Sequence, residues 1–132
     1  MTVAKHTGSC LCGGVAYQLT GPLREIVGCH CTQCRKTSGH HVAATRVDNA
    51  QLAMTSDKTL AWYRSSDEAE RGFCARCGGN LFWRRVGSDR TSIMAGTLDG
   101  DTELPFRRHI FVKDKADYMT LPQDADAYEY AD

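Results

Sequence analysis

The stretch "GCHCTQCRKTSG", residues 28 to 39, decides the fold, because it places three cysteines within six positions. Four more cysteines lie outside it, two upstream in "SCLCGG" and two downstream in "FCARCGG". Cysteines at such short spacings occur in metal sites, disulfide frameworks and redox dithiols. The rest of the sequence has to distinguish among these three possibilities.

The composition favours metal ligation. The chain has 132 residues and 7 cysteines, and an odd number cannot pair completely within one chain. The N-terminal stretch "MTVAKHTGSCLCGG" lacks the apolar core of a signal peptide, so we expect a cytoplasmic protein in a compartment where disulfides do not persist. No apolar run approaches the roughly 20 residues that a membrane span needs.

The charge balance points to small-molecule partners. The 16 basic and 16 acidic side chains give a formal net charge of zero. No global field therefore attracts nucleic acid or an anionic membrane, and we expect neither as a partner. A homodimer is possible, but the sequence does not determine the oligomeric state.

The cysteine spacing suggests two sites of different kinds. A Cys-x-x-Cys turn can point both thiolates at one zinc ion at about 2.3 Å, and Gly78 and Gly79 allow the backbone to curl behind such a turn. A structural zinc needs four ligands, which the two outer clusters supply as Cys10, Cys12, Cys74 and Cys77. The middle cluster could hold a second zinc through three bonds, leaving its fourth position open to water or a substrate. Its members are Cys29, Cys31 and Cys34.

Other arrangements stay open at this stage. The chain could hold one structural zinc with three incidental thiols, or a redox dithiol, although no βαβ pattern surrounds the Cys-x-x-Cys pairs. A histidine could close the second site as a fourth ligand, with His30, His40 and His41 near enough in sequence. Spacing alone does not exclude a second site that is purely structural.

The hydrophobic pattern predicts a mainly β fold of short, mostly antiparallel strands. Apolar-rich segments bounded by turn residues are read as strands at residues 14–21, 41–47, 58–65, 80–85, 91–98 and 109–114. Residues 31–39 could form one turn of helix, and the acidic tail from Pro122 another. Without a linker or repeat, we expect one domain over residues 1–132, with a solvated tail at 122–132 that takes no part in chemistry.

Five blocks of the sequence carry a resemblance to a known family. In order they are "GSCLCGGVAY", "CHCTQCRKTSG", "FCARCGGNLFW", "MAGTLDG" and "HIFVKDKADY". They resemble the glutathione-dependent formaldehyde-activating enzyme family, whose domain also occurs in centromere protein V. The resemblance covers residues 8 to about 118. One departure is that Asp117 and Tyr118 stand where the family usually carries a tryptophan.

The resemblance implies a β-tent fold of small antiparallel sheets that binds two zinc ions per chain. It assigns a structural zinc to the outer cysteines and a catalytic zinc to Cys29, Cys31 and Cys34. The implied activity is that of a carbon-sulfur lyase of the S-(hydroxymethyl)glutathione synthase type, which joins glutathione and formaldehyde or cleaves their adduct. Another thiol or aldehyde remains possible. The alternative function is a zinc-containing module that binds a thiol or a partner without turnover.

The segment that follows the last middle cysteine supplies candidate substrate contacts. Arg35, Lys36 and Ser38, with Thr37 between them, could aim cations and hydroxyl groups at a bound anion. An ordinary solvated basic turn has the same composition. His30 lies between two candidate ligands and should point away from the metal if both cysteines point towards it.

Overall fold

The computed structural model describes residues 5–131. Residues 1–4 of the N-terminal stretch and residue 132 of the acidic tail lie outside the described part. Within it the chain forms eleven strands and a few short helices. The elements are β1 (Lys5–Ser9), β2 (Val15–Thr20), β3 (Ile26–Cys29), α1 (Thr32–Ser38), β4 (Val42–Asp48), a 3₁₀ helix (Asn49–Gln51), β5 (Leu52–Asp57), β6 (Leu60–Arg64), β7 (Ala69–Cys74), β8 (Asn80–Arg85), β9 (Arg90–Met94), a 3₁₀ helix (Ala95–Thr97), β10 (Phe106–Ile110), a 3₁₀ helix (Val112–Asp114) and β11 (Asp126–Ala127).

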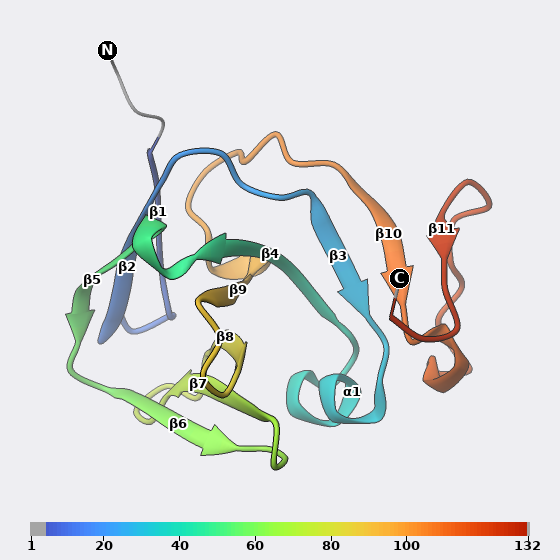
Figure 1. Ribbon diagram of the computed structural model, residues 1–132, viewed down its shortest axis with the longest axis horizontal. Coiled ribbons are helices and arrows are strands. Elements are labelled where there is room, and N and C mark those ends of the chain that lie inside the picture. Colours follow the sequence, from blue (N-terminus) through green and yellow to red (C-terminus); the bar gives the residue numbers. More distant parts are fainter. Residues whose placement is uncertain (1–4, 132) are drawn as a thin grey trace.

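The strands form two sheets, so the prediction of a mainly β fold is confirmed (Figure 1). The smaller sheet has the order β1-β2-β5, and both of its pairings are antiparallel. The larger sheet has the order β11-β10-β3-β4-β9-β8-β7-β6. Most of its pairings are antiparallel, but β10 runs parallel to both β3 and β11. Helix α1 follows β3 directly and lies beside the larger sheet (Figure 1).

The main core lies where the two sheets meet. On β2 the side chains of Val15, Tyr17 and Leu19 alternate inward and are at most 1% exposed, as the period-2 pattern predicts. They pack against residues of β4, β8 and β9 in the larger sheet, including Phe82, whose ring meets that of Tyr17 edge to face. Each such buried side chain contributes about 1.5–3 kcal/mol relative to an exposed one. This cluster also contains Cys10 and Cys74.

A second, smaller core lies under α1. It contains Cys34 of the helix, Val42 and Ala44 of β4, and Met94 of β9. Cys29, Cys31 and Trp83 are partly buried against it. The outer and middle cysteines are therefore anchored in two different apolar clusters.

Two predicted strands are shorter in the structure than the sequence suggested. The segment 91–98 is a strand only to Met94, because Thr97 Oγ1 donates to the Met94 carbonyl oxygen and the chain turns into a 3₁₀ helix. The segment 109–114 is a strand only to Ile110. The next residue, Phe111, has φ of 54°, a left-handed conformation that no strand adopts.

The helical turn expected in the acidic tail is absent, although most side chains of residues 122–131 are exposed, as expected. No helix begins at Pro122; instead β11 pairs in parallel with Arg108 and His109 of β10. Main-chain hydrogen bonds continue this docking, since Phe111 donates to Tyr130 and Val112 donates to Tyr128, both at 3.0 Å. The tail therefore covers the edge of the larger sheet rather than extending freely into solvent.

None of the helices within residues 5–131 has the length and apolar character that a bilayer crossing requires, and α1 has seven residues.

Candidate metal centres

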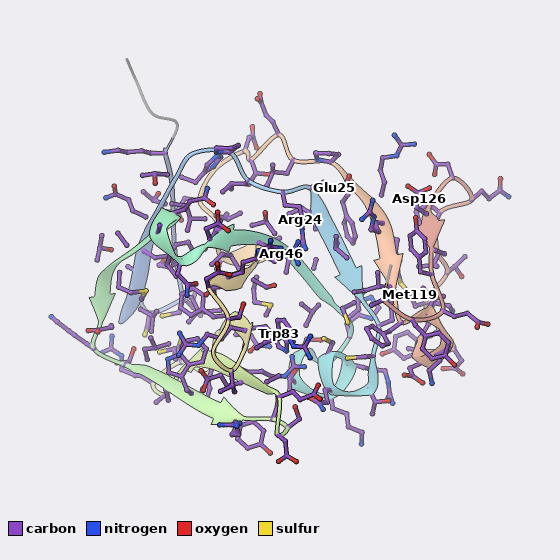
Figure 2. All side chains as sticks on the ribbon, in the orientation of Figure 1. Arg24, Glu25, Arg46, Trp83, Met119 and Asp126 are labelled. Carbon is purple, nitrogen blue, oxygen red and sulfur yellow. The ribbon has the colours of Figure 1, made fainter. Side chains whose placement is uncertain are left out.

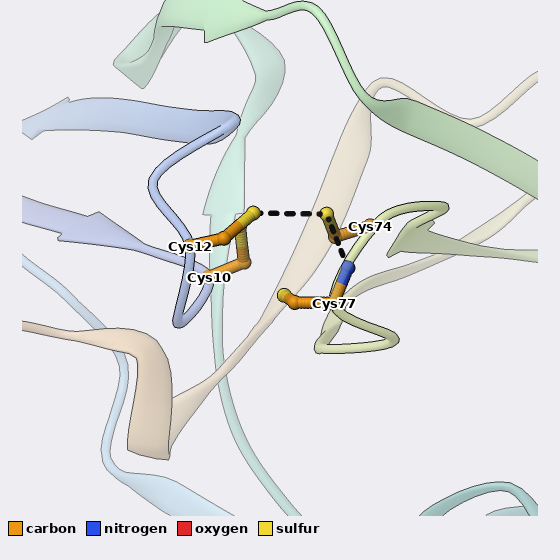
Figure 3. A group of neighbouring side chains, drawn as sticks. All are labelled: Cys10, Cys12, Cys74 and Cys77. Atoms are coloured by element: carbon orange, nitrogen blue, oxygen red, sulfur yellow. Dashed lines mark hydrogen bonds between the residues drawn. The ribbon is translucent and has the colours of Figure 1, made fainter.

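The four outer cysteines converge from two turns (Figure 3). Cys10 and Cys12 lie in the turn between β1 and β2, whereas Cys74 ends β7 and Cys77 lies in the turn that leads to β8. Gly78, with φ of 78°, closes this second turn by donating to the Cys74 carbonyl oxygen at 2.8 Å. All four sulfur atoms lie within 4.8 Å of one another.

The sulfur distances allow a test of zinc against disulfides. Four sulfurs at about 2.3 Å from one tetrahedral ion are separated by about 3.8 Å. The Cys10 and Cys12 sulfurs are 3.7 Å apart, and those of Cys12 and Cys74 are 3.6 Å apart. A disulfide would require about 2.05 Å, and every cysteine is a free thiol. The geometry of this group fits a tetrahedral metal ion.

Contacts of two outer sulfurs favour thiolates, whereas burial raises the pKa of the Cys10 thiol. Thr59 Oγ1 lies 3.0 Å from the Cys74 sulfur, and this hydrogen bond lowers the pKa of Cys74 to about 5. Arg76 Nε donates to the Cys12 sulfur at 3.3 Å. Metal ligation requires deprotonated cysteines, so both contacts favour the ligating form.

The three middle cysteines form a separate group, held by the connection between β3 and α1. Cys29 ends β3, Cys31 caps the N-terminus of α1, and Cys34 lies in its first turn. The Cys31 sulfur accepts a hydrogen bond from the Cys34 main-chain nitrogen at 3.3 Å, which fixes the cap. The three sulfurs lie within 4.8 Å of one another, and none of the histidines in the described chain joins this group. The group offers three ligands.

The three middle cysteines differ in the direction in which their pKa is shifted. Hydrogen bonds with Cys29 and Cys34 lower the pKa of Cys31 to about 2. The hydrogen bond between Cys29 and Cys31 raises the pKa of Cys29. Three thiolates so close together repel one another. Full ionisation of the group therefore calls for a compensating cation, which a metal ion would supply.

A buried arginine, which the sequence did not reveal, faces the middle group. Arg71 of β7 is 3% exposed, and both terminal nitrogens of its guanidinium lie 3.7 Å from the Cys34 sulfur. These nitrogens also donate to Thr37 Oγ1 and Gln33 Oε1, each at 3.4 Å. The same guanidinium thus contacts the sulfur group and the helix that carries it. It places a positive charge beside three cysteines that could ligate a metal ion.

The predicted substrate contacts on α1 differ in their surroundings. Ser38 Oγ donates to the Cys34 carbonyl oxygen at 2.6 Å and accepts from the His40 main-chain nitrogen, so this hydroxyl helps to end the helix. Lys36 is exposed and Arg35 is half-buried. Both lie in the last turn of α1. Contact between these three residues and a substrate stays a prediction.

Four histidines form a cluster behind the middle cysteines. His30 is 2% exposed, and its Nε2 lies 2.9 Å from Nδ1 of His109; its ring also stacks on His41. His40 packs between His41 and Tyr118, one of the two residues at the family's usual tryptophan position. Burial lowers the pKa of His30 to about 4, which keeps this imidazole neutral. The cluster joins the end of β3 and the segment before β4 to His109 of β10, and none of its histidines belongs to the sulfur group.

Three comparisons relate the chain to known proteins. A family model described as glutathione-dependent formaldehyde-activating enzyme matches residues 5–114. An uncharacterised lyase of Schizosaccharomyces pombe is 25% identical over 114 residues, which make up 86% of this chain and 82% of the relative. A crystal structure of a Rhodobacter sphaeroides protein shares the fold, with a TM-score of 0.62 at 22% identity; the match covers 76% of this chain and 98% of the other.

Proposed function

The chain belongs to the glutathione-dependent formaldehyde-activating enzyme family, and from this premise we propose that it is a zinc-dependent carbon-sulfur lyase or ligase. Its substrates would be adducts of glutathione with an aldehyde, such as S-hydroxymethylglutathione. The similarity to a protein named as a lyase supports the class of reaction. The choice of glutathione and formaldehyde rests on the family description alone.

The observation that carries this proposal is the division of the cysteines into a group of four and a group of three. The four sulfurs complete a tetrahedral set, so they would hold a structural zinc ion. The three sulfurs leave one position for an exchangeable ligand, which a reaction centre needs and a purely structural site does not. Cys29, Cys31 and Cys34 would therefore hold the catalytic zinc.

A zinc ion in the group of three would supply a positive charge and an open position, where a thiol is favoured as its thiolate. The chain's own residues have two tasks. The cap at Cys31 and the turn of α1 hold the sulfurs in place, and Arg71 offsets their excess negative charge. Arg35 and Lys36 would add positive charge on the solvent side of α1.

The reaction is a reversible addition without oxidation or reduction. The thiol sulfur bonds to the aldehyde carbon, and the carbonyl oxygen takes up one proton as the thiol loses one. Cleavage of the adduct reverses both changes. Because thiols add to formaldehyde without help, the protein has only a small barrier to lower, and an assay must measure rates against that background.

The test is exchange at equilibrium. Magnetisation-transfer NMR on a mixture of glutathione, ¹³C-formaldehyde and their adduct gives the exchange rate with no net reaction. We expect zinc-loaded protein to raise this rate and Cys31→Ser to return it to the protein-free value. Arg107→Gln, which changes an exposed side chain of β10, is the matched control and should behave as the wild type.

The same experiment distinguishes an enzyme from a binding module. An unchanged exchange rate, together with zinc-dependent binding of glutathione, would overturn the enzyme proposal and favour a module that binds thiols without turnover. Failure of glutathione to bind at all would instead reject this substrate, and other thiols and aldehydes would follow in the same assay.

A further inference from the structure

A groove lined by arginines lies on the larger sheet, beside the middle cysteines. It has a volume of about 280 Å³ and is lined by residues of β4, β8 and β9 and of the turn between the last two. The residues that matter here are Arg46, Trp83, Arg85, Asp89 and Arg90. Arg46 and Trp83 both lie near the centre of the view in Figure 2.

Strand register places this groove on the same sheet face as the middle cysteines. Arg46 of β4 and Trp83 of β8 both pair with Ser92 of β9, so the three side chains form one row across the sheet. The neighbouring row pairs Ala44 with Met94, and these two residues pack against Cys34. Two residues along a strand span roughly 7 Å, which is the offset between the rows.

Trp83 connects the groove to the apolar cluster around the middle cysteines. It lines the groove and also packs against the apolar cluster that contains Cys34. A molecule that occupies the groove therefore lies one side chain away from the sulfur group. Glutathione, a tripeptide-sized molecule, spans on the order of 10 Å when extended, which is enough to cover this offset.

The charges of the groove complement those of an acidic thiol. Arg46 forms no ion pair with any residue in the described part of the chain, and Arg85 and Arg90 pair with Glu68 at 3.3 Å and Asp48 at 3.9 Å. Both pairs are exposed, and pairs of this kind are weak enough to exchange for a ligand. Asp89 adds one carboxylate. The groove thus offers cations for carboxylates and one anion for an ammonium group.

We propose that this groove binds the carboxylates of the thiol substrate, with Asp89 facing its ammonium group, and so selects acidic thiols such as glutathione. This inference rests on the proposed function of the neighbouring sulfur group. A zinc ion with three thiolates has a net charge of −1, which repels an anionic substrate. Arginines placed beside the sulfurs reduce this repulsion without occupying the open position.

The test uses S-methylglutathione, which keeps both carboxylates and the ammonium group but cannot form a thiolate. In a Trp62→Phe background, Trp83 is the one tryptophan left in the chain, so its fluorescence reports on the groove. We expect the zinc-loaded protein to bind S-methylglutathione saturably with a change in Trp83 emission. Arg46→Gln should weaken this binding about three- to ten-fold, the effect of losing one partly exposed charge contact.

Two controls define the result. Arg107→Gln removes an exposed arginine from β10, outside the groove, and should change the affinity less than two-fold. The diethyl ester of S-methylglutathione lacks the carboxylate charges, so it should bind weakly and to the same degree in wild type and Arg46→Gln. Equal affinity of wild type and Arg46→Gln for the acid form would overturn the inference. So would an absence of binding, even if the exchange assay shows catalysis, in which case the proposed function stands without this groove.

Discussion

Replacement of Arg71 by glutamine removes a charge that the structure buries against the middle sulfurs. Both terminal guanidinium nitrogens lie 3.7 Å from the Cys34 sulfur, and the side chain is 3% exposed. Glutamine keeps a polar group on β7 but carries no charge. The expected result is a lower affinity for zinc in the group of three, because the ion with three thiolates has a net charge of −1 that Arg71 offsets.

Coulomb's law gives the size of the effect. At 3.7 Å and an effective dielectric constant of about 20, two unit charges attract by about 4 kcal/mol. Measured hydrogen bonds to charged groups contribute about 1.5–3 kcal/mol, and the lower value allows for water that enters the variant. A loss of about 1.5–4 kcal/mol corresponds to a zinc affinity that is roughly 10-fold to 1,000-fold weaker.

The assay is competition for zinc against a chelator of known affinity, with elemental analysis of what remains bound. The group of four is an internal control, since Arg71 does not contact it and its ion should stay. Arg71→Lys keeps the charge without the two-pronged contact and should lie between wild type and Arg71→Gln. Arg84→Gln, which removes a half-exposed ion pair with Glu70 on the adjacent strand, controls for general loss of stability.

The reasoning would be refuted if folded Arg71→Gln bound its second zinc within three-fold of the wild-type affinity. It would also be refuted if Arg84→Gln weakened the second zinc as much as Arg71→Gln does, since the effect would then come from strand stability and not from charge at the sulfurs.

Three further predictions concern the metal ions, the cysteines and the histidines. The chain should hold two zinc ions, and a mild chelator should remove the one with three protein ligands first. Cys74→Ser should prevent folding, whereas Cys31→Ser should leave a folded chain with one zinc; equal unfolding of both variants by circular dichroism would contradict separate roles. Burial lowers the pKa of His41 below its ordinary 6.5, so the unfolded state takes up a proton below that pH that the folded state does not, and stability should fall as the pH falls. His41→Phe should flatten this fall by up to about 1.4 kcal/mol per pH unit, and identical slopes of wild type and variant in denaturant titrations would contradict the assignment.

The sequence predicted the cysteine groups because their geometry is largely local. Cys31 and Cys34 are separated by two residues, as are Cys74 and Cys77, so each pair is brought together by one turn whatever the rest of the fold does. The helix at residues 32–38 and the inward alternation on β2 follow from equally local patterns. The two outer pairs were assigned to one site because a structural zinc ion needs four ligands. The observed sulfur distances agree with that assignment.

Features that depend on strand register could not be predicted from the sequence. Arg71 lies in "AERGFC", where nothing distinguishes it from Arg84 and Arg85 on the neighbouring strand. Arg71 is 3% exposed and reaches Cys34, whereas Arg84 and Arg85 form ion pairs nearer the surface. Only the pairing of β7 with β8 and the position of α1 decide which arginine is buried. The tail was misjudged for the same reason, since its polar composition hides the backbone hydrogen bonds that dock it on β10.

Arg71 and the arginines of the groove would interact with different parts of a bound substrate complex. Arg71 acts on the sulfurs: it is buried, fixed by Thr37 and Gln33, and close enough to influence whether three thiolates and a zinc ion can coexist. Arg46 lies in the same cross-strand row but three strands away, on β4, where it is exposed, forms no ion pair within residues 5–131 and could meet the far end of a substrate. If zinc occupies the group of three as proposed, a thiolate that entered its open position would add a second negative charge, which Arg71 alone would not balance. A substrate whose own carboxylates are held away from the sulfurs would therefore bind with less repulsion. The register of β4, β8 and β9 places arginines where those carboxylates could be held.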